Sequence, residues 1–208
     1  MLRCTSDNRY LAALFAVDLG NYGRNTLPIK ELFKRLRAES RSVQFIAYHW
    51  RRSGNFIFVS RDETSIREAE TLGRRVIGLP CIARSLLDLE RVDRALPSSV
   101  MTTSRGSLAL LTSDGPRKLI YVALSGSIPS SNQLAGKLGS RSQILSWPSG
   151  RDVLCHYDRP AKGGDVGQVT NAVLASLQKS LTGGGLYATG RAIGVIRDLL
   201  SGNGLRYS

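Results

Sequence analysis

The chain has 208 residues, 42% of them hydrophobic, and no apolar run approaches the roughly 20 residues that a transmembrane helix needs. Its 29 Lys and Arg against 16 Asp and Glu give a formal charge of +13, which creates a positive field that attracts polyanions. The three cysteines are far apart, and the first residues lack the apolar centre of a secretory signal. Composition therefore predicts a soluble, cytoplasmic protein with no membrane contact and with nucleic acid or another polyanion as partner. A GC-rich genome is the alternative explanation of the many arginines.

The first half of the chain predicts the order strand, helix, strand, strand, helix, strand. Residues 10–19 (YLAALFAVDL) are a nearly continuous apolar run, typical of a central strand that is buried on both faces. Pro28 suits the first turn of a helix, and Asp62 suits the N-cap of another. In chain order we expect a strand at 10–19, a helix at 28–39, a hairpin of strands at 42–50 and 55–60, a helix from 62 to between 72 and 77, a strand at 81–84 and an added helix at 85–96.

The second half repeats this order after a linking strand. LIYVAL predicts a second central strand, and the PSG turn predicts a second hairpin. Two βαββαβ lobes, residues 1–97 and 98–208, are therefore expected instead of one large sheet. In chain order we expect strands at 100–111 and 118–124, a helix at 129–138, a hairpin at 141–147 and 152–157, a helix at 165–181, a strand at 186–189, a helix at 191–200 and a frayed tail at 203–208.

The loop GNYGRN between the first strand and the first helix is a candidate anion site. Free N–H groups and the positive end of the helix dipole would face a ligand there, and Arg24 adds a guanidinium group. The spacing matches neither a Walker loop nor the dinucleotide fingerprint. The alternative is that Gly20 and Gly23, with Asn25, only form a tight turn.

A second candidate is the hairpin turn and the strand that follows it. Phe56 and Phe58 share one face, as do the aromatic residues with which RNA-recognition domains stack bases. Ile57 makes the other face apolar as well, which favours a strand packed in the core on both sides. Arg51 and Arg52 in the turn would contact phosphates. Because we expect the first and third strands to run parallel, this turn and the GNYGRN loop should lie at opposite ends of the sheet.

The sequence contains no catalytic or metal-binding signature. His49 and His156 have no recognisable partner, and Cys155 and His156 are neighbours in a strand, so they point to opposite faces. The Cys, His, Asp and Glu residues do not have the spacing of metal ligands. We therefore expect no catalytic residues, no metal and no cofactor.

Several strings together resemble one bacterial family. LGNYGRNTLPIKELF, RRSGNFIFVS, GRDVLCHY and QVTNAVLASL followed by ATGR occur in the order found in domain of unknown function 1697. The resemblance covers most of the chain and implies two ferredoxin-like lobes, but it implies no reaction. The positions that match the family strings become candidate functional residues: Gly20, Gly23, Arg24, Asn25, Ser53, Gly54, Asn55, Thr170, Asn171, Thr189 and Arg191.

The chain also departs from the family strings at polar positions. Phe15 and Asp18 stand where the family has Arg and Asn, and Gln168 stands where it has Lys. The triplet after Arg191 is apolar here, whereas the family has Asn-Trp-Asn. A divergent or repurposed member is therefore expected. Within the QVTNAV helix, Thr170 could join a hydrogen-bond cluster or a ligand site with the ATGR strand end.

These observations predict an α+β fold of two ferredoxin-like βαββαβ lobes in tandem. We expect a non-enzymatic binding protein that takes nucleic acid or another phosphorylated ligand through its Arg-rich loops. Two alternatives remain open at this stage. One is a small-molecule enzyme of specialised metabolism that uses the cleft between the lobes. The other is an interaction protein that forms a homo-oligomer.

Overall fold

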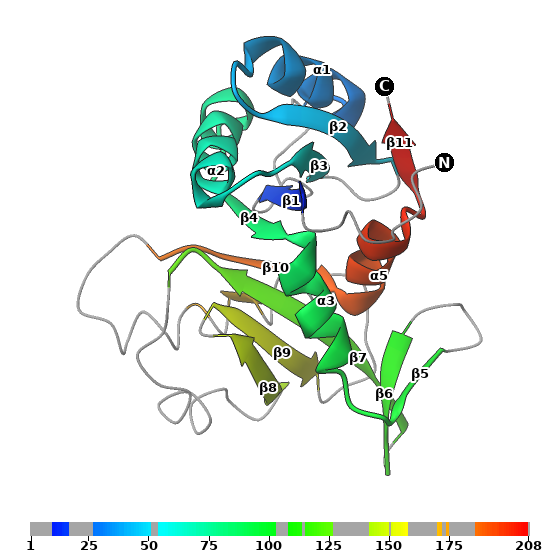
Figure 1. Cartoon of the computed structure of the whole chain (residues 1–208). Coiled ribbons are helices and arrows are strands. Elements are labelled where there is room, and N and C mark those ends of the chain that lie inside the picture. Colours follow the sequence, from blue (N-terminus) through cyan, green and yellow to red (C-terminus); the bar gives the residue numbers. More distant parts are fainter. Residues whose placement is uncertain are drawn as a thin grey trace. The chain divides into compact units, whose positions relative to one another are not determined.

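The computed structural model describes residues 10–16, 27–50, 54–102, 108–113, 115–126, 142–149, 151–157, 170–171, 174 and 186–207 (Figure 1). The fold is mixed α+β with two antiparallel sheets. Contacts divide the chain into two units, Met1–Glu90 with Val195–Ser208, and Arg91–Gly194. This division differs from the expected boundary at 97/98, because the last fourteen residues, 195–208, belong to the first unit.

The first sheet is antiparallel throughout. Its spatial order is β11-β2-β3-β1-β4. The expectation that the first and third strands run parallel was wrong, since β1 and β3 pair antiparallel. The crossover through a helix returns the chain to its starting direction, and the hairpin then reverses it. The strands are β1 (Leu11–Ala16), β2 (Gln44–His49), β3 (Asn55–Val59), β4 (Cys81–Ser85) and β11 (Leu205–Tyr207).

Helices α1 (Ile29–Glu39) and α2 (Glu63–Ile77) lie against one face of this sheet (Figure 1). Phe56 and Phe58 are fully buried in the core cluster that includes both helices. The core interpretation of these rings is therefore confirmed, and they cannot stack bases. Asp62 caps α2 as predicted, because its Oδ1 accepts a hydrogen bond from the Ser65 backbone N–H at 2.8 Å. These bonds from Ser65 hold the pKa of Asp62 below its usual value.

Helix α3 (Leu86–Arg94) follows β4 directly, as the sequence predicts. Ser85 is its cap, since the Asp88 backbone N–H donates to Ser85 Oγ at 3.1 Å. Leu86, Leu89 and Val92 are buried. None of the helices in the described part of the chain combines the length and the apolar character that crossing a membrane requires.

The second sheet is built around one long strand, β7 (Gly115–Leu124). The single strand expected at 100–111 is instead two short strands. Strand β7 pairs with β6 near its start and with both β9 and β10 further along. The helix expected at 129–138 lies outside the described residues, and of 165–181 only Thr170, Asn171 and Leu174 are described, all helical. The other strands are β5 (Val100–Thr102), β6 (Leu108–Thr112), β8 (Ser142–Ser149), β9 (Asp152–Tyr157) and β10 (Ala188–Ala192).

The two sheets share a strand order. In the first, β2-β3-β1-β4 are neighbours, and in the second, β8-β9-β7 are neighbours with β10 on the other side of β7. If β1 to β4 are numbered one to four, and β7 to β10 likewise, the spatial order of the strands is 2-3-1-4 in both sheets. The repeat of elements predicted from the sequence therefore corresponds to a repeat of strand order.

The C-terminal residues are paired, so the prediction of a frayed tail was wrong. Helix α5 (Ile193–Ser201) is followed by β11, which pairs antiparallel with β2. Gly202 and Gly204 adopt φ values of 78° and 69°, which favour glycine, and they turn the chain back toward the sheet. Trp50 N–H then donates to Gly204 O at 3.0 Å. The tail thereby adds an edge strand to the first sheet.

Candidate nucleic-acid interface

The end of the first sheet at which β1 stops is also the end at which β3 starts. Phe15 lies opposite Asn55, and Ala16 N–H donates to Gly54 O at 2.8 Å. The prediction that the two candidate loops lie at opposite ends is therefore wrong, because the chain segments 17–26 and 51–53 attach at the same end. Those segments lie outside the described residues and contain seven candidates: Gly20, Gly23, Arg24, Asn25, Arg51, Arg52 and Ser53.

Arginine and aromatic side chains form a row from α1 across β2 to β11; we call the set the aromatic-arginine row, defined as Arg37, Phe33, Tyr48, Arg206 and Trp50. The Arg37 guanidinium lies 5.8 Å from the centroid of the Phe33 ring, and that ring lies 5.1 Å from the Tyr48 ring. Tyr48 pairs with Arg206 in the sheet register. The Arg206 guanidinium lies 5.4 Å from the centroid of the Trp50 ring, and Trp50 is 45% exposed. The row therefore runs from α1 to a solvent-exposed indole.

Helix α1 carries two further cations on the face that contains Arg37. Lys30, Lys34 and Arg37 are exposed and occupy positions i, i+4 and i+7, which lie on one face of a helix. Glu31 approaches Lys34 at 4.0 Å and Arg35 at 3.9 Å, but these ion pairs are exposed and contribute little. The helix face beside β2 is therefore cationic.

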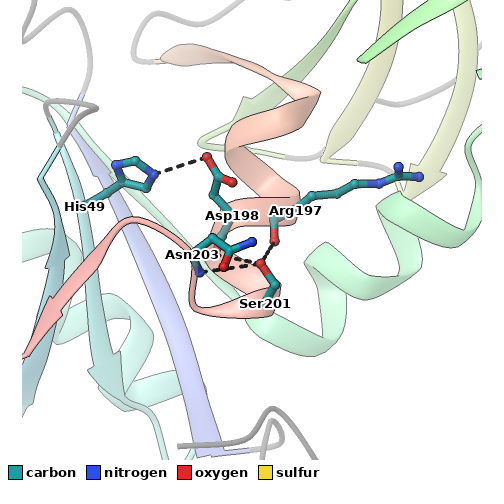
Figure 2. A network of polar contacts seen from close by, with 5 residues as sticks. All are labelled: His49, Arg197, Asp198, Ser201 and Asn203. Carbon is teal, nitrogen blue, oxygen red and sulfur yellow. Dashed lines mark hydrogen bonds and ion pairs between the residues drawn. The ribbon is translucent and has the colours of Figure 1, made fainter. Parts of the chain in front are cut away.

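A short polar network holds β11 in place (Figure 2). His49, 1% exposed, lies 3.3 Å from Asp198 of α5 through its Nε2 atom. Ser201 Oγ donates to Arg197 O at 2.8 Å and accepts from Asn203 N–H at 3.5 Å. A Cβ atom at Gly204 would lie only 2.8 Å from the His49 ring, so glycine lets the backbone pass over the imidazole. These contacts fix the strand that carries Arg206.

A groove of about 790 Å³ on the other side of α1 also contains arginines. Arg41, Arg67 and Arg75 line it, together with Glu39 and Glu68. Arg75 forms an ion pair with Glu39 at 3.4 Å. Because carboxylates alternate with the guanidinium groups, this groove is less suited to a polyanion than the cationic face of α1.

The candidate residues of the second unit lie on or near β10. Arg191 Nη1 donates to Thr189 Oγ1 and to Gly190 O, both at 2.7 Å. Thr189 is buried, and Arg191 is half-buried. Thr170 is buried in a helical segment and Asn171 is exposed. The contact expected between Thr170 and the strand end stays a prediction, whereas Thr189 and Arg191 form a local hydrogen-bonded pair.

Sequence reasoning missed a second polar pair in this unit. Tyr121 and Asp152 are both buried, and the Tyr121 hydroxyl donates to Asp152 Oδ1 at 2.6 Å. On the opposite face, burial raises the pKa of the Cys155 thiol to about 12. The thiol is therefore protonated at neutral pH and unsuited to act as a nucleophile. Within the described ranges, no group of three or more His, Cys, Asp and Glu side chains could hold a metal ion.

The Trp50–Arg206 contact was missed as well. Arg51 and Arg52 following Trp50 were the available signal, since single-strand binding sites combine positive charge with aromatic side chains. Nothing in the tail sequence indicated that Arg206 would return to this place.

Comparisons with known proteins add little to this description. No family model matches the chain, and no curated protein matches it. Among solved structures, the chain is similar to one described as a crystal structure study of an anthrone oxidase-like protein, with 12% sequence identity over 93% of this chain and 96% of that one. The TM-score is 0.26, too low to carry an argument about fold or function.

Proposed function

We propose that this chain is a binding protein, not an enzyme, that takes nucleic acid or another phosphorylated ligand at the end of its first sheet. The observation that carries the proposal is the direct pairing of Ala16 with Gly54. The segment that contains Arg24 follows Ala16, and the segment that contains Arg51 and Arg52 precedes Gly54. Both segments are therefore attached to the same end of the first sheet. A ligand with several phosphates can meet both segments there.

Charge supports the same proposal. The formal charge of +13 favours association with polyanions over long distances. The cations Lys30, Lys34 and Arg37 extend from this end of the sheet along α1, so phosphates beyond the first could also be neutralised.

We also propose that both units are ferredoxin-like lobes. The shared spatial order of strands supports this proposal, because a βαββαβ chain with that order is the ferredoxin-like arrangement. A cytoplasmic setting and the relation to domain of unknown function 1697 remain parts of the proposal that rest on the sequence alone.

The test is fluorescence anisotropy with a labelled oligonucleotide at increasing salt. If about four phosphates of a single-stranded oligonucleotide are neutralised, affinity should fall roughly 50-fold between about 50 mM and about 200 mM salt. Replacing Arg51 and Arg52 with Ala should remove most of the binding. Arg61→Ala with Arg67→Ala is the matched control, because it changes the net charge equally and Arg61 follows β3 at the opposite end of the sheet.

Three results would contradict the proposal. The first is absence of binding, and the second is binding that salt does not weaken. The third is an equal loss in both double variants, because that would indicate diffuse attraction instead of a site at this end.

A further inference from the structure

We propose that Trp50, ordered by Arg206, is a platform on which an unpaired base stacks, so that the ligand is a single-stranded nucleic acid. This inference rests on the proposed function and narrows its ligand class. Charge alone does not distinguish nucleic acid from other polyanions, because heparin or polyphosphate could also bind a cationic surface. A stacking platform requires a base.

The first step is that the phenylalanines of β3 and α1 cannot stack bases. Phe56 and Phe58 are fully buried beneath the helices, and Phe33 is 1% exposed. Trp50, by contrast, is 45% exposed at the end of β2. The indole therefore offers a large planar surface to a ligand.

The second step is that the Trp50 ring is held in place. The backbone N–H of Trp50 donates to Gly204 O at 3.0 Å, and the Arg206 guanidinium lies 5.4 Å from the centroid of the Trp50 ring. A guanidinium over an indole is attracted by the ring quadrupole and also stacks as a planar group. The ring is thereby ordered before a ligand arrives, which lowers the entropic cost of stacking.

The third step is that a phosphate-binding group adjoins the platform. The Arg206 guanidinium lies beside the Trp50 ring and can bind a phosphate that flanks a stacked base. Proteins that bind single strands without strict sequence preference stack a base on an aromatic ring and bind the neighbouring phosphates with cationic side chains. In a duplex the bases are stacked and paired, so the same ring would find no free base.

The experiment compares two labelled probes of equal length, an oligothymidylate and an abasic oligonucleotide that has the phosphates without the bases. Trp50→Leu should weaken oligothymidylate binding roughly 5- to 150-fold, the loss expected for one stacked base, and should leave abasic binding unchanged. Arg206→Lys keeps the charge but loses the planar group, and should also weaken only oligothymidylate binding. Circular dichroism checks that both variants are folded.

Intrinsic fluorescence provides a second readout, because the chain has two tryptophans, Trp50 and Trp147. Quenching by oligothymidylate should persist in Trp147→Phe and disappear in Trp50→Phe. Quenching that persists in Trp50→Phe would contradict the platform.

The outcomes separate the two proposals. If both probes bind and Trp50→Leu binds them as the wild type does, the platform is wrong and polyanion binding stands. If neither probe binds the wild-type chain, both proposals fail. If duplex DNA binds as tightly as oligothymidylate and shows the same loss in Trp50→Leu, the restriction to single strands is wrong.

Discussion

The two sheets place different side chains at equivalent positions of one strand order. In the first, Ala13 lies opposite Arg84 of β4, and in the second, Tyr121 lies opposite Arg191 of β10. An arginine therefore recurs at the same register position. The strand that follows the hairpin turn begins at Asn55 in the first sheet and at Asp152 in the second.

What differs is where the polar chemistry lies. In the second sheet, Tyr121 and Asp152 form a buried hydrogen bond beside the pair formed by Thr189 and Arg191. The first sheet also buries Asn55 and Arg84, but it has Ala13 at the place of Tyr121. Its unit adds exposed cations on α1 and the exposed Trp50 after β2. The comparison teaches that one topology can keep buried polar groups at equivalent positions and still differ in whether a buried tyrosine–aspartate pair or an outward cationic surface is added. Four predictions follow, from the largest expected effect to the smallest.

The largest effect is expected for the cores. Leu14 and Val122 occupy equivalent central positions, and both are fully buried. Leu14→Ala should lower the free energy of unfolding by about 2–5 kcal/mol, because it removes buried methyl groups and leaves a cavity. Val122→Ala should cost less, since fewer atoms are lost. Urea unfolding measures both, and an equal loss would mean that the site of Val122 relaxes less around the removed atoms than the site of Leu14 does.

The next effect concerns the buried pair of the second sheet. Tyr121→Phe removes the hydroxyl that donates to the Asp152 carboxylate, and should lower the free energy of unfolding by about 1.5–3 kcal/mol. Binding of oligothymidylate should not change, because the proposed ligand surface lies on the first unit. Loss of binding in a folded Tyr121→Phe protein would shift the functional site to the second sheet.

Replacing either of two helix glycines with alanine should change the free energy of unfolding, in opposite directions at the two positions. A Cβ at Gly73 of α2 would lie 2.9 Å from Cys81 Sγ and from Leu14 Cδ2, whereas one at Gly194 of α5 would meet nothing within 4 Å. Gly73→Ala should therefore destabilise the fold by about 1–3 kcal/mol through overpacking. Gly194→Ala should stabilise it by about 0.4–1 kcal/mol, because the unfolded chain loses freedom. Thermal unfolding distinguishes them, and a shared sign would show that the close contact at Gly73 does not limit packing.

The smallest effect at neutral pH concerns Cys155. Burial raises its pKa from 9.0 to about 12, so the folded protein holds this proton more tightly than the unfolded chain does. The free energy of unfolding should not depend on this thiol below pH 9, and should decrease as the pH rises from about 9 toward 12. Iodoacetamide at pH 8 should leave the Cys155 peptide unmodified in the folded protein and modify it in urea. Rapid modification of the folded protein would mean that this face of the sheet is open.

Much of the fold could be predicted because local signals were strong. The apolar run from Leu11 to Ala16, the Asp62 cap and the Ser85 cap each determine their element through interactions of near neighbours. The repeated order of elements was predictable for the same reason. Strand direction was misjudged at β3, although the hairpin already required a reversal of the chain.

The sequence by itself determined the charge, the repeat and the double burial of the strand that contains Phe56, because these follow from composition and short-range pattern. Only the tertiary structure decided the contacts between distant residues. Tyr121 meets Asp152 and Trp50 meets Arg206 across long stretches of chain, and pairing of that kind follows from strand register, which no local pattern encodes.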